Sequence, residues 1–265
     1  MHWTGLALSL ACSPPPDDVL SDSATDSGSD SAVDTGGDDT LGSLQGRMID
    51  ADGVGAAGLQ MRLCNDSCYM AETDGDGAFS FGYLSEGSYT LQAVDAANAD
   101  RATPHAILLV ELGARTLPDW RIPEFAATTE LTAPATVGLD QGLTVAADAA
   151  TLSSGPYAMS DVAAVRSVWV DPAASGLPRD GLDGEIAALW YLGTYDLQVS
   201  PPWPLGGTIA LPAGTYGVWT ADNATKSWLR GGAVTVDAEG AVGLKSGGLE
   251  RLTTLVLIEE ETGAK

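Results

Sequence analysis

The sequence predicts an all-β protein in which two antiparallel β-sandwich domains follow a disordered acidic N-terminal tether. Among 265 residues there are 32 glycines and 14 prolines, which favour tight turns between short strands over long helices. From residue 43 onward, short apolar stretches alternate with polar residues, as in strands that bury one face. The expected boundaries are 1–11 for a signal segment, 12–42 for the tether, 43–123 for the first sandwich and 124–260 for the second.

The charge of the chain limits its partners. It has 36 acidic and 12 basic residues, which give a formal net charge of -24 at pH 7. Such a surface repels phosphate backbones. Nucleic acid is therefore excluded as an expected partner.

The first residues favour export. Residues 6–11 are apolar except for Ser9 and lead directly into Cys12, Ser13 and a run of prolines. This arrangement resembles the lipobox of bacterial lipoproteins, in which the cysteine behind a short apolar region becomes the lipidated N-terminus. The resemblance implies that Cys12 carries a membrane anchor on an exported protein, at the outer membrane or cell surface of a bacterium.

The segment behind Cys12 has the composition of a spacer. Residues 13–42 contain eight aspartates, no basic residue and almost no apolar side chains. A chain that cannot bury apolar surface stays disordered. A calcium-binding role is the alternative, but calcium needs carboxylates held in a fixed cage, which this tract does not supply.

Two further cysteines, Cys64 and Cys68, are expected to form a disulfide. They remain as an even pair if Cys12 is lipidated, and an exported protein lies in an oxidising compartment. Their spacing fits a hairpin loop, in which facing residues lie close together. A zinc site needs more Cys and His ligands than the chain supplies, so we expect no metal and no cofactor.

The first sandwich is predicted from alternating strands and a tight turn. Leu59, Met61 and Leu63 share one face of a strand, and Phe79 and Phe81 share one face of another.

Between these strands lies a reversal made of Asp74, Gly75, Asp76 and Gly77. Short acidic side chains hydrogen-bond the backbone of such a turn, and glycine permits positive φ. The spacing also matches the first half of an EF-hand loop, but a strand follows where a calcium loop would stay irregular.

The turn and the strand behind it also carry a resemblance to a known family. Residues 73–81, followed by Leu84, Gly87, Tyr89 and Leu91, resemble the carboxypeptidase regulatory-like module. The resemblance covers about residues 43–123 and implies a transthyretin-like or immunoglobulin-like sandwich. It implies no peptidase activity, because the module is an appended unit and the chain has no histidine-bearing metalloprotease motif.

The second half has the strand and turn signals of another sandwich. Its expected strands are 136–139, 143–147, 167–170, 186–192, 196–199, 208–211, 216–220, 233–236, 242–244 and 253–258. The Gly-Thr-Tyr of residues 214–216 repeats the Gly-Ser-Tyr of residues 87–89. We interpret both as the same local motif, in which a turn is followed directly by a strand.

The sequence does not favour an enzyme. Beyond the signal segment the only histidine is His105, expected in a loop beside Pro104, and no Gly-x-Ser-x-Gly motif occurs.

The aromatic residues of the second half offer a different function. Tyr191, Trp203 and Trp219 are the expected surface aromatics, and aromatic faces stack on sugar rings.

The function predicted from the sequence is that of a non-enzymatic, lipid-anchored structural or interaction module. Its expected partners are the membrane, through the anchor, and either a glycan or another surface protein. The alternative is a carbohydrate-binding surface protein that uses the aromatic residues of the second half.

Overall fold

A computed structural model describes residues 41–155, 164–193 and 196–260. The signal segment, Cys12 and all of the tether except Leu41 and Gly42 lie outside the described residues. In the described part the chain forms strands and three short 3-10 turns, η1 (Asp140–Gly142), η2 (Ala149–Thr151) and η3 (Pro172–Ala174). The predicted all-β class is confirmed.

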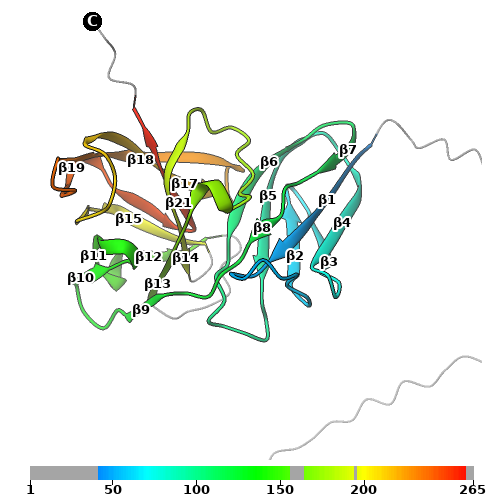
Figure 1. Cartoon of the computed structure of the whole chain (residues 1–265), viewed down its shortest axis with the longest axis horizontal. Coiled ribbons are helices and arrows are strands. Elements are labelled where there is room, and N and C mark those ends of the chain that lie inside the picture. Colours follow the sequence, from blue (N-terminus) through cyan, green and yellow to red (C-terminus); the bar gives the residue numbers. More distant parts are fainter. Residues whose placement is uncertain (1–40, 156–163, 194–195, 261–265) are drawn as a thin grey trace, which may run out of the picture. The chain divides into compact units, whose positions relative to one another are not determined.

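The first half, residues 41–123, contains two sheets (Figure 1). Its strands are β1 (Gly42–Ile49), β2 (Gln60–Cys64), β3 (Cys68–Glu72), β4 (Ala78–Leu84), β5 (Gly87–Val94), β6 (His105–Val110), β7 (Gly113–Thr116) and β8 (Trp120–Arg121). One sheet has the order β3-β2-β5-β6 and is antiparallel throughout. The other has the order β4-β1-β7, with β8 also on β1.

One part of this half departs from the predicted antiparallel arrangement. Strand β1 pairs antiparallel with β4 but parallel with β7 and β8. Parallel pairing of sequence-distant strands leaves no tight-turn signal in the sequence, because a crossover must join them.

The alternating residues of the first half fill the space between its two sheets. Leu59, Met61 and Leu63 are completely buried, and Phe79 and Phe81 are nearly so, with their ring centroids 6.0 Å apart. Gly46 permits this packing, since a Cβ at that position would lie only 2.8 Å from Cζ of Phe79. The inward face predicted for these strands is confirmed.

The second half, residues 124–260, contains three sheets (Figure 1). Its strands are β9 (Ala127–Glu130), β10 (Ala135–Gly138), β11 (Leu143–Ala147), β12 (Leu152–Ser154), β13 (Ala164–Val170), β14 (Ile186–Gly193), β15 (Leu197–Trp203), β16 (Leu205–Gly207), β17 (Gly214–Asp222), β18 (Ser227–Val236), β19 (Val242–Gly247), β20 (Leu249–Leu252) and β21 (Thr254–Glu259). A seven-stranded sheet runs in the order β19-β18-β17-β21-β14-β13-β9. Two three-stranded sheets, β10-β11-β16 and β12-β15-β20, complete this half.

The central strands of the seven-stranded sheet are covered on both faces. Side chains on one face, such as Trp190 and Leu257, belong to a cluster shared with the two three-stranded sheets. Side chains on the other face, such as Tyr191 and Val256, belong to a cluster that also contains the core of the first half. The central strands β14, β17 and β21 therefore have little contact with solvent.

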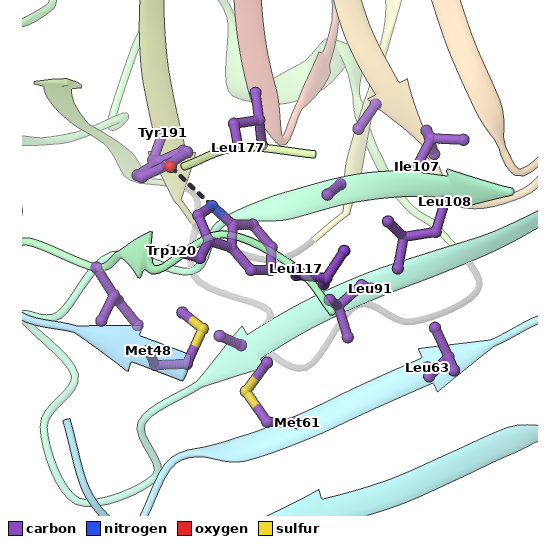
Figure 2. Close-up of a cluster of buried hydrophobic side chains, with 14 of the residues drawn as sticks. Met48, Met61, Leu63, Leu91, Ile107, Leu108, Leu117, Trp120, Leu177 and Tyr191 are labelled. Atoms are coloured by element: carbon purple, nitrogen blue, oxygen red, sulfur yellow. Dashed lines mark hydrogen bonds between the residues drawn. The ribbon is translucent and has the colours of Figure 1, made fainter. Parts of the chain in front are cut away.

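We call the contact between residues 41–123 and residues 124–260 the seam. At one point of the seam Trp120 donates its indole N–H to the hydroxyl oxygen of Tyr191, at 3.0 Å (Figure 2). At another, Arg115 forms an ion pair with Asp180, whose carboxylate also accepts the backbone N–H of Leu109. Named strands pair only within their own half, yet the apolar core continues across the seam.

The repeated Gly-hydroxyl-Tyr sequence has the same structure in both halves. Tyr89 and Tyr216 are both buried near the start of a strand. The hydroxyl of Tyr89 donates to the carbonyl of Ser85, and that of Tyr216 donates to the carbonyl of Pro212, each four residues upstream. Both tyrosines thus fix the turn that leads into their strand.

Candidate functional site

The predicted aromatic surface is not formed, because Tyr191 is completely buried. An exposed Tyr191 would require a strand with one solvent face. Strand β14 lies between β13 and β21, and each face of it packs against a different core cluster. Burial also raises the pKa of the Tyr191 hydroxyl, although Trp120 donates to it.

Trp203 is also buried, and Trp219 is only partly exposed. Trp203 ends β15, and its indole N–H donates to Oγ1 of Thr151 at 2.8 Å. Pro201 and Pro202 are tolerated in β15 because its pairing with β20 is interrupted between Gln198 and Trp203. Trp219 packs against the shared core cluster, so the three predicted residues do not form one surface.

The Asp74–Gly77 reversal is held by hydrogen bonds between the Asp74 side chain and the backbone of the turn. Oδ1 of Asp74 accepts the backbone N–H groups of Asp76 and Ala78, each at 2.9 Å. Gly77 has φ +80°, and a Cβ there would lie 2.2 Å from the carbonyl oxygen of Met48. These contacts give Asp74 and Gly77 a structural role in joining β3 to β4. Within the described residues no group of three or more His, Cys, Asp or Glu side chains is placed to hold a metal ion.

Cys64 and Cys68 form a disulfide that closes the loop between β2 and β3. They lie directly opposite each other in the antiparallel ladder, with Cα atoms 4.1 Å apart. Asp66, inside this loop, forms an ion pair with Lys226 of the second half at 2.8 Å, and Lys226 lowers the pKa of the Asp66 carboxyl. The disulfide thus shapes a loop that reaches across the seam.

Replacing both cysteines by alanine is expected to destabilise the protein only modestly. The closed ring is short, so the chain-entropy contribution of the disulfide to the free energy of unfolding is about 2 kcal/mol. The pairing of β2 with β3 and β5 also holds these strands together. Urea unfolding of Cys64→Ala/Cys68→Ala beside the wild type measures this difference. Failure of the double variant to fold would show that the bond determines the first half's structure.

One cleft is a better candidate binding site than the predicted aromatic residues. It has a volume of about 1200 Å³ and lies beside η3, at the start of β14 and β17 and the end of β21. Its lining combines apolar side chains with charged groups, among them Leu177, Tyr216, Arg179, Glu185 and Glu259. Arg179 and the two glutamates are exposed, so a ligand in the cleft can contact both a positively charged group and negatively charged groups.

His105 is not in the predicted loop. It begins β6, is buried, and its Nδ1 lies 3.1 Å from Nδ2 of Asn223. Burial lowers the pKa of His105 from 6.5 to about 4, the contact with Asn223 opposes this shift, and the charge of Arg62 adds to it. His105 is thus held as a neutral group in the seam, and within the described part of the chain Asn223 is the only hydrogen-bond partner of its ring.

No protein-family model matches the chain, and no curated protein matches it. Three similar solved structures are a candidate carbohydrate-binding protein from Bacteroides uniformis, the major pilin SpaD from Corynebacterium diphtheriae and a DUF3823 family protein from Bacteroides ovatus. Their sequence identities are 10%, 12% and 12%, and their TM-scores are 0.27, 0.29 and 0.26. The matches cover 83%, 82% and 84% of this chain and 99%, 81% and 83% of the others. Likeness at this level assigns neither family nor function.

No pattern in the sequence predicts the cleft or the seam. Tyr191 and Trp120 are 71 residues apart in the chain, and His105 and Asn223 are 118 apart. Arg179 and Glu185 lie in a Gly- and Asp-rich stretch that resembles an ordinary loop. Only the three-dimensional fold brings these residues together.

Proposed function

We propose that this chain is a non-enzymatic, exported surface module, attached to a membrane by lipid on Cys12 and held away from it by the acidic tether. Residues 41–260 then act as one rigid structural or interaction unit that presents a surface to glycans or other surface proteins. The proposal includes the two sandwich domains at 43–123 and 124–260 and the resemblance of the first to carboxypeptidase regulatory-like modules.

The continuous core across the seam is the observation that supports this proposal most. One apolar cluster contains Met61 and Leu91 of the first half together with Leu189 and Val256 of the second. A buried hydrogen bond and ion pairs cross the same contact. Two sandwiches joined in this way move together, as a structural element requires. In the described residues no helix is long and apolar enough to cross a lipid bilayer.

Membrane attachment is tested by fractionating cells that express the wild type or Cys12→Ala in the presence of labelled fatty acid. We expect label and membrane association in the wild type and neither in the variant. A single acyl chain binds only marginally, so stable attachment requires the several chains typical of a lipoprotein cysteine. Equal release of both proteins, without label, would refute the anchor.

Carbohydrate binding is a second candidate function, and the cleft beside η3 favours it. A cavity of about 1200 Å³ exceeds the usual size range of small-molecule sites, and its polar groups suit hydroxyl-rich ligands. A glycan array with the full-length protein, Arg179→Ala and Glu185→Gln tests this function. Loss of the signal in both variants, with retention in Lys245→Ala on β19, would support the cleft. Absence of any wild-type signal would reject it.

A further inference from the structure

A small polar cluster lies in the otherwise apolar seam. Gln92 of β5 and His105 of β6 are direct neighbours in their ladder. From the second half, Asn223 contacts the ring of His105, and Oγ1 of Thr254 accepts the backbone N–H of His105 at 2.9 Å. The cluster therefore joins β5 and β6 to the β17–β18 turn and to β21.

The side chains of this cluster are held by packing more than by hydrogen bonds. Gln92, His105 and Asn223 are each at most 1% exposed. Among the described residues, both polar atoms of the Gln92 amide, Nε2 of His105 and Oδ1 of Asn223 have no hydrogen-bond partner. Buried polar groups with few partners contribute little to holding two surfaces together.

The charges around His105 do not favour a second positive charge. Arg62 of β2 lies opposite Gln92 in the ladder, and its guanidinium donates to Oε1 of Gln60. Lys226 of the β17–β18 turn is paired with Asp66 of the disulfide loop. Asp222, at the end of β17, is paired with Arg251 of β20. The nearby carboxylates thus already have cationic partners.

We propose that His105 makes the seam acid-labile: its protonation opens the contact of β5 and β6 with the β17–β18 turn and β21 while the sheets of both halves stay folded. Two observations carry the proposal. The imidazole is buried at the junction of the halves, and only one of its ring nitrogens, Nδ1, has a partner, Asn223, while Nε2 has none among the described residues. Protonation makes both ring nitrogens N–H donors, of which Asn223 can accept only one, and it adds a buried positive charge that Arg62 repels.

The sign of the pH effect follows from the direction of the pKa shift. Burial lowers the pKa of His105 below its ordinary value of 6.5 to about 4. Between these values the open form binds a proton that the closed form does not, so acid favours opening. The contribution of His105 is fully present above pH 6.5 and is lost as the pH falls to about 4. The difference corresponds to a change of roughly two orders of magnitude in the equilibrium between closed and open seam.

Hydrogen exchange of the full-length protein, followed from pH 7 to pH 4 and corrected for intrinsic exchange rates, tests the proposal. We expect protection to fall in β6 and in the β17–β18 turn at a pH where β11 remains protected. In His105→Gln, which is neutral at every pH, this selective loss should disappear. The carboxylates at the seam are unchanged in the variant, so their effects cancel in the comparison.

A second variant keeps the test decisive if His105→Gln fails to fold. Asn223→Asp places a carboxylate beside the ring, which favours the imidazolium, so the loss of protection should move to lower pH. The proposal is overturned if the wild type and His105→Gln lose protection identically, if Asn223→Asp leaves the pH of the loss unchanged, or if protection falls uniformly over both halves.

Discussion

Replacing Trp120 by alanine is expected to lower the free energy of unfolding by about 3–5 kcal/mol, the range for deleting a large buried aromatic ring. The indole is completely buried in the shared core cluster and carries the hydrogen bond to Tyr191 (Figure 2). The substitution therefore leaves a cavity and also an unpartnered hydroxyl in the seam. Urea unfolding followed by circular dichroism measures the loss.

Tyr191→Phe is the matched control, because it removes the hydrogen bond and leaves the ring in place. A buried donor without a partner costs about 1–3 kcal/mol, so this variant should lose less stability than Trp120→Ala. If Trp120→Ala changed the unfolding free energy by less than Tyr191→Phe, the packing described for the seam would be incorrect.

The second large effect is expected in the core of the first half. Phe79→Ala and Phe81→Ala should each cost about 3–5 kcal/mol, because both rings are buried between the two sheets of that half. Ser80, between them on β4, is exposed, so Ser80→Ala should be nearly silent. Chemical denaturation of the three variants gives the comparison.

This series also tests the register of β4 on β1, in which Ser80 lies opposite Gln45. A strand shifted by one residue would exchange the inward and outward faces. Ser80→Ala would then destabilise the protein as much as either phenylalanine change, which is the result that would contradict the structure.

Much of the fold is predictable from local pattern. Strands such as β11, β14 and β17 were expected within a few residues of their observed bounds, because alternation and flanking turns mark a strand that buries a face. The segment 208–211 was predicted as a strand and is not one, since its pairing is limited to an isolated bridge between Thr208 and Ala241. The short strands β9, β12 and β20 were missed because three or four residues are too few to show a period.

The candidate site was less predictable than the fold. The alternation around Tyr191 correctly predicts a strand. Whether the second face of that strand meets solvent depends on residues more than 70 positions away. The same holds for His105, whose neighbours in the sequence resemble a loop while its ring contacts Asn223. Patterns over a few residues report which face of a strand is apolar, and only the assembled layers decide which polar groups become buried with it.

The placement of β1 and β21 has a consequence for degradation by exopeptidases. Strand β1 opens the folded region and lies between β4 and β7, while β21 closes it and lies between β14 and β17. Fraying at either end must therefore break hydrogen bonds to two neighbouring strands at once. Trimming enzymes that digest inward along the chain should therefore slow markedly once they reach β1 or β21.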